Sequence, residues 1–148
     1  MLRHAKSEWP EGVADHDRPL AKRGRRDAPK VGKWLARNDY VPDVVVCSTA
    51  QRTRETWDLV AAKLPDTPDV RFDQRAYGAN AQTLLYLASE LPDECRTGLL
   101  IAHNPGVSDL AGVGFPTAAL AVLTFDGDWA DLAPGQAQLA AFIAPADM

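Results

Sequence analysis

The sequence has 148 residues, which favours a single domain, residues 1–148, built around one hydrophobic core. Hydrophobic residues make up 46% and charged residues 24%, and the formal net charge is -4, so the composition excludes a disordered chain and does not suit a general nucleic-acid binder. Two cysteines without C-x-x-C spacing argue against a zinc site, and the lack of a long apolar stretch or secretory signal predicts a cytoplasmic protein that binds no membrane.

Short apolar runs alternate with longer amphipathic stretches along the chain. Helical spacing predicts helices over residues 23–37, 52–64, 80–91 and 107–110. Apolar runs predict strands over residues 43–47, 70–72, 99–102, 120–125 and 139–143. Strands that alternate with helices need crossover connections, so we expect an α/β fold, a three-layer α/β/α sandwich with a mostly parallel central sheet of five or six strands.

The first strand is a special case. Only Met1 and Leu2 precede the first polar motif, fewer residues than a core strand usually has. Either this strand is unusually short, or further residues precede it in the natural chain.

Polar motifs follow three of the expected strands. Arg3 and His4 follow the first, residues 48–52 follow the strand over 43–47, and residues 103–106 follow the strand over 99–102. The carboxyl ends of parallel strands meet at one edge of an open α/β sheet, where ligands bind. We therefore expect two histidines and two arginines, Arg52 being the second, to lie close together.

This set of side chains suits phosphoryl transfer. Arginine forks match phosphate oxygens, and a neutral imidazole such as that of His4 is a competent nucleophile. A second histidine, His103, adds charge and donors to the transferring phosphoryl group if it is protonated. Each feature alone is common in surface or core positions, so the hypothesis rests on their joint placement. Neither a phosphate-binding loop of the GxxxxGK[ST] type nor a cluster of metal ligands is present, so we expect no metal and no cofactor.

The same motifs resemble those of the histidine phosphatase superfamily, which is phosphoglycerate mutase-like in fold. The segment Leu-Arg-His-Ala-Lys-Ser at residues 2–7 is similar to the small SixA-type phosphohistidine phosphatases. Further matches are residues 15–20 (Asp-His-Asp-Arg-Pro-Leu), 48–56 (a Ser-x-x-x-Arg-x-x-x-Thr element) and 103–105 (His-Asn-Pro). The resemblance runs from Leu2 to about Trp129, nearly the whole chain.

The resemblance implies a role for each matching residue. His4 would attack phosphorus and become phosphohistidine, which water would then hydrolyse. Arg3, Arg52 and His103 would bind the phosphoryl oxygens, and Ser7 and Arg18 are further candidates for substrate binding.

Three departures from the family pattern stand out. Ala5 replaces the glycine of the wider signature, and the stretch from Leu110 to Pro116 is short. No glutamate follows Tyr77, where relatives carry a general acid, so the proton donor is unassigned, with Asp15 and Asp17 as candidates.

The sequence leaves more than one class of substrate open. Short linkers leave no room for a lid, which favours a phosphorylated protein, and the protonated ring of phosphohistidine is a good leaving group. The alternatives are small phosphomonoesters or nucleotide phosphates and, in another class, a phospho-ligand binding module without turnover. Trp9 is a candidate pocket residue, His16 is expected to be a solvated loop residue, and a monomer is the default expectation.

Overall fold

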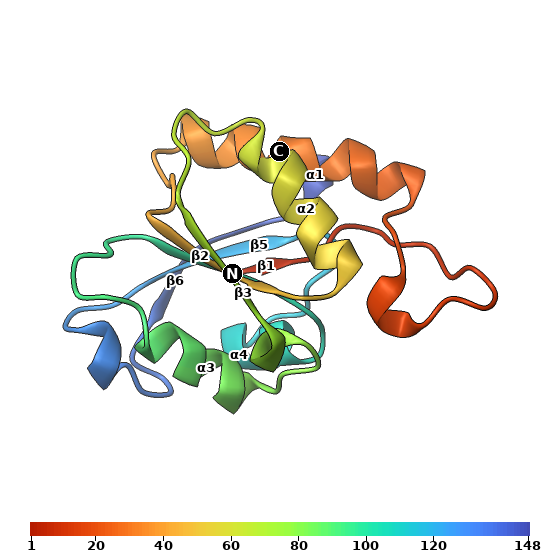
Figure 1. Cartoon of the computed structure of the whole chain (residues 1–148). Coiled ribbons are helices and arrows are strands. Elements are labelled where there is room, and N and C mark those ends of the chain that lie inside the picture. The colour runs from red at the N-terminus through yellow and green to blue at the C-terminus, as the bar shows by residue number, and fades with distance from the viewer.

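A central sheet lies between two layers of helices in the computed structural model, which describes residues 1–148 (Figure 1). Helices α1 and α2 cover one face of the sheet, and α3 and α4 cover the other (Figure 1). The strands are β1 (Leu2–Arg3), β2 (Val44–Ser48), β3 (Asp69–Asp73), β4 (Gly98–Ala102), β5 (Leu120–Thr124) and β6 (Gln138–Ile143). The α-helices are α1 (Lys22–Arg37), α2 (Gln51–Ala61), α3 (Ala81–Ser89) and α4 (Gly106–Ala111). The 3₁₀ turns are η1 (Asp15–Asp17), η2 (Gln74–Ala76), η3 (Trp129–Asp131) and η4 (Pro145–Asp147).

The six strands are arranged in the order β3-β2-β4-β1-β5-β6. The pairs β2–β3, β2–β4 and β1–β4 are parallel, whereas β5 is antiparallel to both β1 and β6. The prediction of a three-layer α/β fold with a mostly parallel sheet is therefore confirmed. Because β1, β2 and β4 are parallel neighbours, their carboxyl ends meet at one edge of the sheet.

The alternation of side chains along β2 explains how one strand serves both layers. Val45 and Cys47 pack into the cluster that includes Val31 of α1 and Trp57 of α2. Val44 and Val46 point to the opposite face and join the cluster under α3 and α4. Successive side chains of a strand point to opposite faces, so an uninterrupted apolar run is what a strand buried on both sides requires.

Two helices differ at one end from the ranges that the apolar spacing predicted. Helix α2 stops at Ala61 and not at residue 64, and Pro65, which disfavours helical geometry in the residue before it, follows closely. Helix α3 starts one residue late because Asn80 is its N-cap, with the side chain accepting the N–H of Thr83 at 2.9 Å. Neither change alters the topology.

The first strand, β1, has only the two residues Leu2 and Arg3. Leu2 and Arg3 pair with Ile101 and Ala102 of β4, and Leu2 pairs with Leu120 of β5. Ahead of Met1, a cavity of about 530 Å³ separates β4 from β5. Its lining residues come from both helical layers and from the sheet between them: Leu35, Leu85, Leu100, Val122 and Trp129 are among them.

Candidate active site

The structure brings Arg3, His4, Arg52 and His103 together at the carboxyl edge of the sheet. Arg3 ends β1, His4 follows it, Arg52 lies in the first turn of α2 and His103 follows β4. The ring centroids of His4 and His103 are 5.3 Å apart. Both rings and the Arg52 side chain are almost completely buried, so their polar atoms are exposed to little water.

Backbone hydrogen bonds hold the first motif in place. The N–H of His4 donates to the carbonyl of Ala102 at 3.2 Å, which extends the pairing of β1 with β4. The N–H of Ala5 donates to Thr56 Oγ1 of α2 at 3.0 Å. On the other side, Gly24 of α1 lies against the backbone of Lys6 so closely that a Cβ atom at Gly24 would collide with the Lys6 carbonyl oxygen. The nucleophile candidate is thus fixed by strand, helix and close packing together.

The backbone also fixes the tautomer of His4. Its Nδ1 atom lies 2.8 Å from the carbonyl oxygen of Ala5, and a carbonyl can only accept. Nδ1 therefore carries the proton of the neutral ring, and Nε2 keeps a free lone pair. Burial is the main cause that lowers the pKa of His4 to about 4, with the positive charges of Arg52 and Arg3 acting in the same direction. At neutral pH the imidazole is uncharged and nucleophilic.

His103 is held by the last residue of β2. Its Nε2 atom lies 2.7 Å from Ser48 Oγ, which already accepts the N–H of Ala50 at 3.3 Å. When the hydroxyl of Ser48 donates to Nε2, the proton of a neutral His103 ring is on Nδ1 and is available to a ligand. Burial, followed by the charge of His4, lowers the pKa of His103 to about 3. Ser48 was not singled out from the sequence, although its place at the end of a buried strand was the available signal.

Three buried side-chain nitrogens have no hydrogen-bond partner, and all three belong to this cluster: Arg3 Nε, Arg52 Nε and His103 Nδ1. An unpaired buried donor costs about 1–3 kcal/mol, so buried polar groups are normally paired. Both arginines are held in place by hydrogen bonds from the far end of the guanidinium group. Arg3 donates to the Phe115 carbonyl at 2.8 Å, and Arg52 donates to the Asp15 carbonyl at 2.8 Å. A tetrahedral anion would satisfy the three remaining donors.

Ser7 and Arg18 lie beside the cluster and bond to each other. Arg18 Nη2 donates to Ser7 Oγ at 2.7 Å, and Arg18 also donates to the Glu8 carbonyl and to Asp15 Oδ1. The guanidinium carbon of Arg18 lies 3.3 Å from the centroid of the Trp9 ring. These contacts hold the loop over residues 8–17. Trp9 belongs to this loop, stacks on Arg18 and has 77% of its surface exposed.

Asp15 connects this loop to the cluster. Its carboxylate accepts from Arg52 at 3.1 Å and from the Tyr77 hydroxyl at 2.6 Å. The hydrogen bond from Tyr77, and then those from Arg18 and Arg52, hold the pKa of Asp15 far below its usual range. An ionised carboxyl has no proton to give, so this environment does not favour Asp15 as the proton donor to the leaving group.

His16 is partly solvated, with 42% of its side chain exposed, but it also makes contacts that the sequence did not predict. Its Nε2 atom lies 2.9 Å from Thr49 Oγ1, and its ring meets that of Tyr77 edge-on with centroids 4.8 Å apart. Tyr77 in turn meets the His103 ring edge-on at 5.6 Å. The sequence carried no pattern that ties these positions together, because they lie on η1, on the β2–α2 turn and after η2.

Comparison with known proteins identifies the family to which the chain belongs. The profile of the histidine phosphatase superfamily (branch 1) matches residues 1–99. An uncharacterised protein of Mycobacterium tuberculosis is 41% identical over 161 residues, covering 97% of this chain and 99% of that protein. A solved structure from Nakamurella multipartitia, named as a candidate phosphohistidine phosphatase SixA, has a TM-score of 0.84 at 31% identity and covers 97% of this chain and 93% of its own. A similarly named structure from Agrobacterium tumefaciens has a TM-score of 0.80 at 29% identity, with 97% and 95% covered.

The fold and the matches define a phosphatase. The chain belongs to the histidine phosphatase superfamily, branch 1. No three His, Cys, Asp or Glu side chains lie close enough together to hold a metal ion. None of the helices has the length and apolar character that crossing a membrane requires.

Proposed function

We propose that this phosphatase transfers the phosphoryl group of its substrate to His4 without a metal ion, and that its substrate is phosphohistidine on a protein. The observation that carries the proposal is the set of three unpaired buried nitrogens on Arg3, Arg52 and His103. They belong to side chains that cluster with His4, whose ring centroid lies 5.3 Å from that of His103, and unpaired donors on two cations suit an anionic phosphoryl group.

The first step is an in-line displacement. The Nε2 lone pair of His4 attacks phosphorus while the bond from phosphorus to the leaving atom breaks. Arg3 and Arg52 neutralise the phosphoryl oxygens, and Nδ1 of His103 adds a further donor. A donor of this kind contributes about 10²–10³-fold to the rate. The backbone bond from His4 Nδ1 to Ala5 supports the positive charge that develops on the imidazole.

In the second step water attacks the phosphorus of the phosphohistidine, the bond from phosphorus to Nε2 breaks, and the electron pair returns to His4. The same three donors hold the phosphoryl group in both steps. Because His4 is neutral again after hydrolysis, the enzyme is ready for the next cycle. A binding module would need the cations alone, whereas the chain also fixes an uncharged imidazole among them.

A protein substrate fits the surroundings of the site. Helix α4 has only six residues, and residues 112–119 alone connect it to β5, so this connection holds no inserted lid domain. The neighbouring loop over residues 8–17 projects away from the sheet beside the site (Figure 1). Phosphohistidine is also the substrate that the names of the Nakamurella and Agrobacterium structures give for those proteins.

The experiment compares phosphate release, in the presence of a metal chelator, from a phosphohistidine peptide and from p-nitrophenyl phosphate. We expect the peptide to be preferred and the His4→Ala variant to be inactive on both. Turnover of small esters alone would support the phosphatase activity and contradict the proposal of a protein substrate. Phosphate binding without any turnover would leave a binding module.

A further inference from the structure

The leaving group of this reaction needs a proton that none of the four clustered residues can supply. When the bond to phosphorus breaks, the electron pair passes to the leaving atom, which is then protonated. Burial lowers the pKa of His4 to about 4 and that of His103 to about 3, so neither ring holds a second proton at neutral pH. The arginines stay charged, and Asp15 is ionised.

One titratable side chain remains at the entrance of the cluster. His16 directly follows Asp15, whose carbonyl accepts from Arg52. Its Nε2 atom bonds to Thr49, and Thr49 directly follows Ser48, which holds His103. His16 is therefore tied by adjacent residues to two members of the phosphate-binding set. Histidine is the side chain whose ordinary pKa lies closest to neutral pH, as a general acid requires.

A row of packed rings runs from the buried centre of the cluster to the surface. His4 and His103 are buried, at 7% and 6% exposed, whereas the side chain of His16 is 42% exposed. Tyr77 lies between His103 and His16 and contacts both rings edge-on. In an in-line displacement the leaving group departs on the side of phosphorus opposite His4. His16 is the solvent-exposed end of this row of rings.

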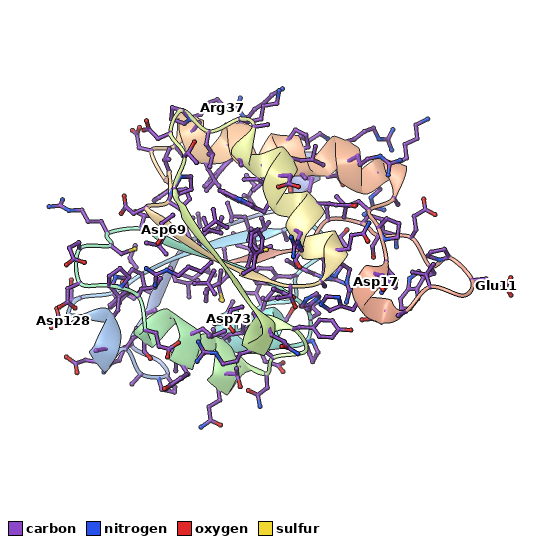
Figure 2. The ribbon with its side chains drawn as sticks, in the orientation of Figure 1. Glu11, Asp17, Arg37, Asp69, Asp73 and Asp128 are labelled. Carbon is purple, nitrogen blue, oxygen red and sulfur yellow. The ribbon has the colours of Figure 1, made fainter.

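A carboxylate faces the other nitrogen of the same ring. Asp17 Oδ1 lies 3.6 Å from His16 Nδ1, and Figure 2 shows Asp17 on the turn where the loop rejoins the body, while Glu11 projects from the loop's tip. With Asp17 beside Nδ1, the Nε2 atom of the ring is the one directed to Thr49. The two other charged neighbours, Asp15 and Arg18, are paired with each other.

We propose that His16 is the general acid of this phosphatase, an inference that rests on the proposed function. In the first step Nε2–H of His16 gives its proton to the leaving atom as the bond to phosphorus breaks, and His16 becomes neutral. In the second step neutral His16 takes a proton from the attacking water as the bond from phosphorus to His4 breaks. One water is consumed, and the protons on His16 balance over the cycle.

The test is the dependence of phosphoenzyme formation on the leaving group. Single-turnover rates are measured for wild type and His16→Gln with aryl phosphates that range from good to poor leaving groups. Glutamine places an amide N–H near the position of Nε2, so the bond to Thr49 can persist while the titratable proton is lost. Thr49→Val is the matched control, because it removes the bond to His16 and keeps the imidazole.

We expect His16→Gln to lower the rate by about 10²–10⁴-fold with the poorest leaving group and to change it little with p-nitrophenyl phosphate. Thr49→Val keeps the imidazole and loses only its anchor, so it should show the same dependence on the leaving group with a smaller loss than His16→Gln. A loss in His16→Gln that is equal for all substrates, or no loss at all, would overturn the proposal. Inactivity of the wild type on every substrate would instead refute the proposed function, so the two failures are distinguishable.

Discussion

His4 Nδ1 lies 2.8 Å from the carbonyl oxygen of Ala5, so the backbone of the residue after the nucleophile decides which ring nitrogen faces the substrate. This relationship needs no acidic partner of the kind that orients a histidine in hydrolase triads. Burial then keeps the ring neutral. Four further consequences can be measured.

Stability should depend on pH through the two buried histidines. Burial lowers the pKa of His4 to about 4 and of His103 to about 3, whereas in the unfolded chain both titrate near 6.5. Between about pH 6.5 and 4 the unfolded state binds protons that the folded state does not, so the free energy of unfolding falls as the pH falls. The slope is at most about 1.4 kcal/mol per pH unit for each histidine.

Urea titrations at pH 4.5 to 7 measure this slope. His4→Gln removes one of the two groups, and its slope should be smaller than that of the wild type. The N-terminal amine of Met1 has its pKa lowered to about 5 by burial and adds a slope of the same sign that both proteins share. Equal slopes in the two proteins would show that His4 is not neutral in the folded state.

Arg52 should not tolerate lysine. Its guanidinium bonds to the carbonyl and the carboxylate of Asp15 with two nitrogens and leaves Nε for the substrate, an arrangement that a single ammonium cannot reproduce. We expect Arg52→Lys to lower kcat/KM by about 10²–10³-fold. Arg54→Lys, on the same helix over the Phe72 ring, is the matched control and should retain activity. Equal activity of the two variants would remove Arg52 from the site.

Gly24 should be required for the position of the first motif. A Cβ atom there would collide with the Lys6 carbonyl, so Gly24→Ala must displace either α1 or residues 4–7. Overpacking of this kind costs about 1–3 kcal/mol. Gly114→Ala is the control, because nothing lies within 4 Å of the position its Cβ would take. The melting temperature Tm and the phosphatase activity should both fall in Gly24→Ala and stay near the wild-type values in Gly114→Ala.

The cavity between β4 and β5 should accept an added strand. The pairing of β1 with β4 begins with Leu2 opposite Ile101, so the earlier residues of β4 that line the cavity, Gly98 to Leu100, have no partner residue in β1. A short apolar extension ahead of Met1 would continue β1 into this space and replace the buried amine by a peptide N–H. We expect Tm to rise by about 2–4 °C for each kcal/mol gained. A polar Gly-Ser extension of equal length is the control, and an equal Tm in both would contradict the prediction.

The sequence was sufficient for the layers of the fold and for the four clustered residues, because both follow from local patterns. Apolar runs such as Val44–Val46 identify strands buried on both faces, and polar residues after parallel strands must meet at one edge. The contacts of Asp15, Tyr77 and His16 could not be predicted in this way. They depend on how an irregular loop returns to the sheet, which no periodicity in the chain encodes.

The contacts that orient the two histidine rings could not be predicted from the sequence either. Nothing in the chain order shows that Ala5 orients His4 or that Ser48 holds His103, because these are distances between atoms and not spacings between residues. The short Leu110–Pro116 segment, which departs from the family pattern, places the Phe115 carbonyl against Arg3 and Asn104.

The most direct test of this account is to trap the phosphoenzyme. The wild type is mixed with a phosphohistidine peptide in chelator, quenched within the first turnover at alkaline pH, and mapped by mass spectrometry, with phosphorus NMR to identify the nitrogen. The account predicts one phosphoryl group on Nε2 of His4, absent in His4→Ala. Phosphate release with no phosphoryl group on His4, or a group on His103 or His16, would contradict it.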